Sequence, residues 1–293
     1  MFQIIHNMHE GTARMSLEQL KQALRTLVPR SVRNWIRSPE RSARWVWNCT
    51  LFSLGITRTL EMEPDWRIIC HPHAYEVASR SQIGDREQAD EIRNFRSHCW
   101  RGMLLFDIGA HYGIFSLAAV NAGGKSVAVE PSPVAAQMIS IQAAINNCAE
   151  SIQIVRAAAS SEVGPMGLLS SGVFSDGYFR VARNRPASEL IQTPGLTVDE
   201  LTNQFGPPTH IKIDVEGHEM AVLRGGRVTL ERHSPVLFLE VHNQIMTSEG
   251  GDPGALLDEL ARIGYNTFGL RGEPIKKCAI LKYPIVRIVA RRC

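Results

Sequence analysis

The segment "MLLFDIGAHYGIFSLAAV", residues 103–120, decides the fold, because it joins a short apolar run to a helical pattern through an acid and two glycines. The apolar run ends at Asp107, Gly109 and Gly113 follow, and helical spacing begins at about Ile114. Glycines let the chain turn sharply and let a ligand approach the backbone, while the N-terminus of the next helix faces the same crevice. The segment therefore predicts a nucleotide-type binding site at the end of a strand.

Further apolar runs follow this segment and alternate with helical patterns. They read SVAVE, IQIVRA, IKIDV, VLFLEV, NTFGL and IVRIVA, and they are rich in Val, Ile and Leu. Such runs are typical of strands in a mostly parallel sheet that helices cover on both faces. We therefore predict a doubly wound α/β domain over residues 96–293. Residues 1–95 are predicted to be a basic helical extension, with helices over 16–28 and 39–53.

The composition is that of a folded protein with a sizeable core. The 293 residues are 44% hydrophobic and 21% charged, which excludes a disordered chain. Six cysteines without a CxxC pair suit free thiols in a reducing compartment, so a cytoplasmic location is expected. The apolar stretch at 45–56 is interrupted by polar residues and is shorter than the roughly 20 residues that cross a bilayer.

The charge is concentrated near the N-terminus. Residues 1–60 hold nine arginines and lysines against three glutamates, a net charge of +6, whereas the whole chain has +3. A basic segment of this kind can lie at the inner surface of an anionic membrane, and the favoured alternative is a solvated helical segment. No nucleic-acid partner is expected. The Ser-, Gly- and Pro-rich stretch 160–195 is interpreted either as a functional cover or as a hairpin insertion.

A second acid indicates which nucleotide binds. The run SVAVEP ends in Glu130, 23 residues after Asp107, where a carboxylate can accept hydrogen bonds from both ribose hydroxyls. A dinucleotide site prefers G-x-G-x-x-G, whereas the glycines here are Gly109 and Gly113, and Asp107 would repel a pyrophosphate. A ligand with a cationic amino-acid end, such as S-adenosylmethionine, fits better. An NAD-dependent oxidoreductase is the weaker alternative.

Polar residues also follow two later strands. "IKIDVEGHEMAVLRGG" (211–226) places Asp214, Glu216 and His218 after a strand, and "PVLFLEVH" (235–242) ends with Glu240 and His242. In open α/β sheets ligands bind outside the carboxyl ends of the strands, so these groups are expected to face the cofactor crevice.

The order of these motifs resembles the FkbM family of S-adenosylmethionine-dependent O-methyltransferases. The resemblance covers about residues 95–270 and includes "FDIGAHYGIFSLAAV", "VAVEPSP", "LTVDEL", "IKIDVEGHEMAVLRGG" and "PVLFLEVH". It implies a class I methyltransferase fold, with a seven-stranded sheet whose last strand is antiparallel. It also implies S-adenosylmethionine as cofactor and methylation of hydroxyls on sugars, glycolipids, polysaccharides or related natural products.

The resemblance also implies roles for individual residues. Asp107, Gly109 and Gly113 would form the loop at the methionine side, Glu130 would bind the ribose, and Asp214 would lie beside the transferred methyl group. Many relatives carry Asn where this chain has His111. The full set of expected cofactor contacts is Asp107, Gly109, Ala110, His111, Gly113, Glu130 and Asp214.

The acceptor is expected to be a hydroxyl on a carbohydrate or glycolipid. Amine and nucleobase methyltransferases often carry N-P-P-Y after the fourth strand, whereas this chain has Asp214 and Glu216 there. A hydroxyl must lose its proton during the transfer, which calls for a base or a metal ion. We expect a metal-free route, in which Asp214 assists and His218 or His242 takes the proton. The alternative is a divalent ion held by Asp214, Glu216 and Glu240.

Glu219 is expected to interact with a helix dipole, and Glu240 to be a structural acid bonded to backbone amides. A zinc site formed by Cys70, His71 and His73 with His98 and Cys99 is disfavoured, because the spacing matches no standard motif. A non-catalytic scaffold that docks through its basic N-terminus remains a further alternative, and the sequence leaves the oligomeric state open.

Overall fold

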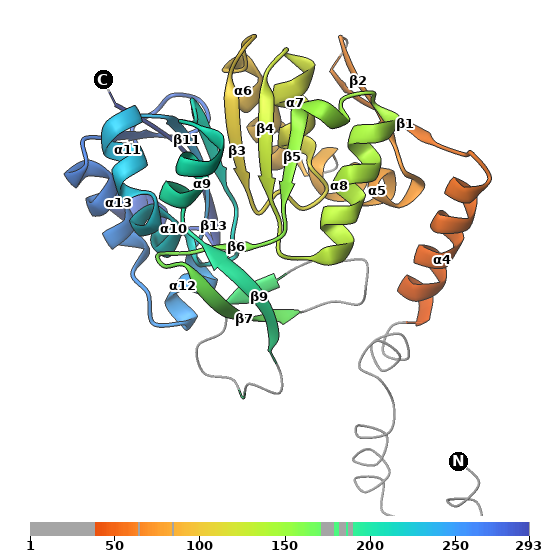
Figure 1. Ribbon diagram of the computed structural model, residues 1–293. Helices are drawn as coiled ribbons and strands as arrows, with labels where there is room; N and C mark the ends of the chain where they lie inside the picture. The colour runs from red at the N-terminus through yellow and green to blue at the C-terminus, as the bar shows by residue number, and fades with distance from the viewer. Residues whose placement is uncertain are drawn as a thin grey trace, which may run out of the picture.

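A seven-stranded sheet forms the centre of the protein (Figure 1). The computed structural model describes residues 39–63, 65–83, 85–170, 179–181, 186 and 190–292. The strand order is β12-β13-β11-β10-β3-β4-β5, and β13 runs antiparallel to both of its neighbours. The predicted seven-stranded sheet with its last strand antiparallel is therefore confirmed. The strands are β3 Leu104–Ile108, β4 Lys125–Val129, β5 Ile152–Val155, β10 His210–Ile213, β11 Val236–His242, β12 Asn266–Phe268 and β13 Ile285–Arg291.

Helices cover the two faces of this sheet and create a separate hydrophobic core on each. Successive side chains of a strand point to opposite faces. Phe106 of β3 therefore packs with Leu201 and Leu256 in one core, whereas Leu105 packs with Phe95 in the other. The helices that follow β3 are α7 Ile114–Asn121, α8 Pro133–Ile145, α9 Val198–Phe205, α10 Glu219–Gly225, α11 Arg227–His233, α12 Asn243–Ser248, α13 Pro253–Arg262 and α14 Lys277–Ile280.

The segment before β3 packs directly against the sheet. It contains α4 Pro39–Ser53, β1 Arg58–Glu63, β2 Trp66–Cys70, α5 Pro72–Val77, η1 Ala78–Ile83 and α6 Arg86–Ser97. The helix expected over 39–53 is confirmed, and the one expected over 16–28 lies outside the described residues. The antiparallel pair β1–β2 lies within the segment that the sequence predicted to be a helical extension. Trp66 shares a core with Leu105, so the boundary placed at residue 95 runs through a common core.

The stretch after β5 forms a second, smaller sheet. It consists of β6 Ala158–Ala159, β7 Gly164–Ser170, β8 Phe179–Val181 and β9 Ile191–Leu196, in the order β6-β9-β7-β8. β7 is antiparallel to both β8 and β9, so the described part of 160–195 is an insertion of hairpin type. Figure 1 shows this sheet beyond the end to which the arrows of β3, β4 and β5 point. It therefore lies where a ligand of the main sheet would bind.

The described residues contain no membrane-spanning helix, and their cysteines are unpaired. Every helix in this part of the chain is too short or too polar to span a membrane. Cys49, Cys70, Cys99, Cys148 and Cys278 are free thiols.

Candidate active site

A cavity of about 330 Å³ lies at the carboxyl end of the main sheet. It is lined by residues in and after the carboxyl ends of β3, β4, β10 and β11, and by Leu168 and Val181 of the smaller sheet. Of the expected cofactor contacts, Gly113 lies outside the lining and instead starts α7 with a φ of 77°. The predicted site residues that do line the cavity are Asp107, Gly109, Ala110, His111, Glu130, Asp214, Glu216, His218, Glu240 and His242.

Asp107 holds the turn between β3 and α7. Its side chain is buried, and Oδ2 accepts hydrogen bonds from the backbone N–H of Ser116 at 3.0 Å and from the Ser116 hydroxyl at 2.6 Å. Burial raises the pKa of Asp107 to about 6, against the opposing effect of the Ser116 hydrogen bonds. The sequence predicted a contact with the methionine side of the cofactor. The structure adds an internal role, which is to fix the first turns of α7 against the strand.

Gly109 brings the ends of β3 and β10 together. Its φ is +80°, and a Cβ built at this position would lie 1.8 Å from the backbone oxygen of Asp214. No other residue type fits such a contact without moving one of the two strand ends. The glycine predicted to let a ligand approach the backbone therefore also sets the distance between the cofactor loop and Asp214.

Glu130 connects the loops that follow β3 and β4. Its Oε2 accepts from the N–H of His111 and its Oε1 from the N–H of Ser132, both at 2.8 Å. Burial raises the pKa of Glu130 to about 8, and the charges of Asp107 and Asp214 act in the same direction. Each carboxylate oxygen has two lone pairs, so the group can still accept hydrogen bonds from two ribose hydroxyls. The predicted ribose contact is compatible with this geometry.

His111 adopts a backbone conformation that favours glycine and asparagine. Its φ is 49°, and its ring stacks on Tyr112 with the ring centroids 3.9 Å apart. Asn, Asp and His occupy this conformation more often than other non-glycine residues do. The histidine therefore keeps the backbone geometry of the loop and adds a ring at the wall of the cavity.

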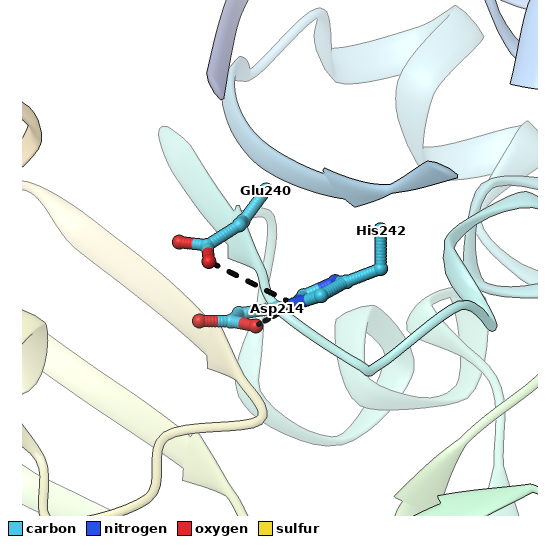
Figure 2. Close-up of side chains that lie close together, drawn as sticks. All are labelled: Asp214, Glu240 and His242. Atoms are coloured by element: carbon cyan, nitrogen blue, oxygen red, sulfur yellow. Dashed lines mark ion pairs between the residues drawn. The ribbon is translucent and has the colours of Figure 1, made fainter. Parts of the chain in front are cut away.

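Asp214, Glu240 and His242 converge at the ends of β10 and β11 (Figure 2). The His242 Nε2 atom lies 3.7 Å from Asp214 Oδ1 and 3.7 Å from Glu240 Oε1. A carboxylate oxygen of Glu216 is also 3.7 Å from Nε2. Burial lowers the pKa of His242, but the hydrogen bond to Glu219 and the neighbouring carboxylates outweigh burial and raise it to about 9. The cluster therefore favours a positive charge at its centre.

Glu219 orients the imidazole of His242. This glutamate is fully buried at the start of α10, and its Oε1 lies 2.8 Å from His242 Nδ1 and accepts from the N–H of Gly217 at 3.0 Å. The sequence predicted that Glu219 interacts with the helix dipole. The structure shows a further contact, because its carboxylate faces His242 of strand β11. Sequence spacing could not reveal this pair, since the two residues are joined only by the packing of α10 on β11.

Two buried cations contact the acids of the cluster, and neither was predicted from the sequence. Lys212 Nζ is 2.9 Å from Glu91 Oε1 and 3.9 Å from Glu240 Oε2, and Arg287 Nε is 3.2 Å from Glu240 Oε2. Glu240 was expected to bond backbone amides and instead pairs with these cations. The sequence did contain an indication of this arrangement, which is the lysine inside the apolar run IKIDV. A charge buried in a central strand is costly unless it has partners, so such a lysine predicts buried acids next to it. Glu91 belongs to α6, which links the N-terminal region to the site.

His218 lies elsewhere on the cavity wall. Its Nε2 is 3.1 Å from the hydroxyl of Ser160, and it precedes α10 directly. Among the described residues, the group with metal-ligand spacing is Asp214, Glu240 and His242, which includes neither His218 nor Glu216. Among the same residues, Cys70, His71 and His73 do not form such a group. There, Cys70 ends β2 and the ring of His71 accepts from the N–H of His73.

The strand order, the antiparallel β13 and a cavity at the carboxyl ends of the parallel strands define a class I methyltransferase fold. The family model described as the methyltransferase FkbM domain matches residues 107–267, which is more than half of the chain, and the protein belongs to this family. It is therefore a methyltransferase, and its cofactor is S-adenosylmethionine.

Solved structures with a similar fold include several methyltransferases. The methyltransferase FkbM from Methylobacillus flagellatus KT has 16% sequence identity and a TM-score of 0.43, and the match covers 65% of this chain and 43% of that one. A precorrin-6y C5,15-methyltransferase from Geobacter metallireducens GS-15 has 14% identity and a TM-score of 0.41, with 72% and 90% covered.

A third similar structure has the cofactor bound. Streptococcus pneumoniae Sp1610, a putative tRNA (m1A22) methyltransferase in complex with S-adenosyl-L-methionine, has 14% identity and a TM-score of 0.38, with 69% and 71% covered. No curated protein matches the sequence. At such identities the similarity concerns the fold and says nothing of the acceptor.

Proposed function

We propose that this protein transfers the methyl group of S-adenosylmethionine to a hydroxyl oxygen of a sugar, glycolipid, polysaccharide or related natural product. The observation that carries the proposal is the cluster of Asp214, Glu240 and His242 on the wall of the cofactor cavity. A hydroxyl acceptor needs a group that removes its proton, and this cluster places carboxylate and imidazole groups side by side. The chain has no N-P-P-Y after β10, where amine and nucleobase methyltransferases often carry it.

The reaction is an in-line displacement. The bond between sulfur and the methyl carbon breaks while the bond between that carbon and the acceptor oxygen forms, so the sulfonium becomes a neutral thioether and the hydroxyl proton leaves. Asp214 is the cluster member nearest the cofactor loop, because its backbone touches Gly109. In this proposal Asp214 orients the acceptor hydroxyl, and the proton passes to a carboxylate of the cluster and then to water.

A second hollow next to the cofactor cavity supports this proposal. It has a volume of about 380 Å³ and shares Val181, Glu216 and His218 with the first cavity. Arg224 and Glu249 are among its lining residues, so its wall carries charged hydrogen-bonding groups. Such groups suit an acceptor with several hydroxyls. His218 lies at the junction of the two hollows, where it is the second candidate for the base.

Methyl transfer by matched variants tests the role of the cluster. The purified protein would be incubated with methyl-labelled S-adenosylmethionine and with carbohydrate and lipid fractions of the producing cell. We expect label in one of these fractions and its loss in Asp214→Asn, with label retained in the control Glu162→Gln on the exposed turn before β7. Full incorporation by Asp214→Asn would remove the cluster from the proposed reaction. No incorporation into any fraction would favour the non-catalytic alternative.

A further inference from the structure

We propose that Asp214, Glu240 and His242 together bind one divalent transition-metal ion at the wall of the cofactor cavity. Each of these residues offers one ligand atom, and the three atoms lie within 4.8 Å of one another. The ligand set differs from the one that the sequence indicated, because His242 replaces Glu216. The binding itself does not depend on the proposed function, and only the consequence for the reaction rests on it.

The spacing of the cluster suits an ion better than direct hydrogen bonds. His242 Nε2 is 3.7 Å from an oxygen of Asp214 and 3.7 Å from an oxygen of Glu240, beyond the roughly 2.7–3.2 Å of a hydrogen bond that a nitrogen donates. Two ligands that each lie about 2.1 Å from one ion can be up to about 4.2 Å apart. The two separations from Nε2 therefore leave room for an ion between the imidazole and each carboxylate.

The imidazole is buried and directed at this space. The side chain of His242 is only 5% exposed, and Nε2 has carboxylate oxygens of Asp214, Glu216 and Glu240 at 3.7 Å. Its other ring nitrogen, Nδ1, lies 2.8 Å from the fully buried Glu219. A histidine that binds a metal commonly donates its second ring N–H to a carboxylate in this way, which fixes the ring and leaves the opposite nitrogen for the ion.

Each carboxylate also contacts a cation outside the cluster. Lys212 Nζ lies 3.7 Å from Asp214 Oδ2 and 3.9 Å from Glu240 Oε2, whereas the other oxygen of each carboxylate faces His242. Arg287 contacts Glu240 Oε2 at 3.2 Å and also donates to Oε1 at 3.3 Å. The two carboxylates are thus oriented by groups outside the cluster. This arrangement pre-forms the ligand set and limits the repulsion between the acids.

The donor set selects the class of ion. One imidazole nitrogen with two carboxylate oxygens suits Zn²⁺, Mn²⁺ or Fe²⁺, whereas Ca²⁺ and Mg²⁺ prefer sites made of oxygen ligands. We take Mn²⁺ as the probe, because its free form gives a strong electron paramagnetic resonance signal. Under the proposed function, the ion would lower the pKa of the acceptor hydroxyl and so ease loss of its proton.

Titration of the full-length protein with Mn²⁺ tests the site without cofactor or acceptor. We expect one bound Mn²⁺ per chain in the wild type and in Glu216→Gln, and binding weaker by at least about tenfold in His242→Ala and in Glu219→Gln. Each variant would first be shown to be folded by its affinity for S-adenosylhomocysteine. A wild-type protein that binds neither Mn²⁺ nor Zn²⁺ would overturn the proposal. Binding that is lost in Glu216→Gln but kept in His242→Ala would also overturn it, in favour of a carboxylate-only site.

Discussion

Glu130 is the single residue whose charge should control cofactor binding most directly. Ribose hydroxyls donate hydrogen bonds to the ionised carboxylate, and burial raises the pKa of this group to about 8 in the cofactor-free protein. We therefore predict that affinity for S-adenosylhomocysteine rises between about pH 6.5 and pH 9. Calorimetric titration at both pH values measures this effect. The rise should be absent in Glu130→Gln, and an equal pH dependence in this variant would assign the titration to another group.

The raised pKa of Glu130 also makes the free energy of unfolding depend on pH. Between the ordinary pKa of 4.5 and the raised value of about 8, the folded cofactor-free protein binds more protons at Glu130 than the unfolded chain. The contribution of this group to the free energy of unfolding is therefore largest below pH 4.5 and is lost as the pH rises through 8. Chemical denaturation across this range should give a shallower decrease for Glu130→Gln than for the wild type. A wild-type decrease no steeper than that of the variant would contradict the assignment.

Asp107 should contribute to stability as well as to cofactor binding. Replacing it by Ala leaves the N–H and the hydroxyl of Ser116 without their buried acceptor, and an unsatisfied buried group costs about 1–3 kcal/mol. We expect the free energy of unfolding to fall by this amount in Asp107→Ala. Ser116→Ala is the comparison variant, because it removes the hydroxyl, which also contacts Ser126, but keeps the backbone N–H bond to Asp107, and it should cost less. Unchanged stability in Asp107→Ala would show that the bonds to Ser116 do not hold the turn.

Residue types at strand ends could be predicted from the sequence, but their partners could not. The predicted cavity is lined by Asp107, Glu130, Asp214 and His242. Acids and histidines at the end of a buried apolar strand lie at the edge of the sheet, where the cavity is. Their contacts, such as that of His242 with Glu219, join side chains of different elements. Such contacts depend on how the helices pack on the sheet, which periodicity in the sequence does not encode.

At the scale of elements, the turn after β3 and the end of β10 form one unit through Gly109. In Gly109→Ala the new Cβ would meet the backbone oxygen of Asp214, so one of the two strand ends must move. We expect loss of S-adenosylhomocysteine binding together with a lower melting temperature. Gly272→Ala is the control, since its φ is +84° with open space around it, and it should cost only about 1–2 kcal/mol of backbone strain. Equal cofactor affinity in both variants would contradict the coupling.

Strands such as β3, β4 and β11 could be predicted because each is a mainly apolar run that is buried on both faces. β1 reads RTLEME and lacks such a run, since only one of its two faces meets the core, and it was missed. The insertion β7–β9 lies in a stretch rich in Gly, Ser and Pro, where composition favours loops as strongly as hairpins. Its strands are stabilised by pairing between distant segments, which no local pattern in the sequence specifies.

At the scale of the whole molecule, the basic N-terminus is proposed to contact an anionic membrane surface. Residues 1–38 hold six arginines and lysines against two glutamates, and α4, which follows, exposes Trp47 and Val46. We predict that the full-length protein sediments with anionic vesicles at low salt and that binding falls as salt rises. Deleting residues 1–38 should weaken vesicle binding and leave cofactor affinity unchanged, because Arg44 and Asn48 keep α4 on Glu76. A full-length protein that ignores such vesicles would exclude this contact.

The chemical bond that the transferred methyl group forms tests the central claim most directly. After reaction with ¹³C-methyl-labelled S-adenosylmethionine and the carbohydrate and lipid fractions, the labelled product would be isolated and the methyl group located by NMR and fragmentation mass spectrometry. We predict a methyl ether on a hydroxyl of a sugar-containing product, absent from the reaction of Asp214→Asn. A labelled methyl group on nitrogen or carbon, or on a nucleic acid, would contradict the account.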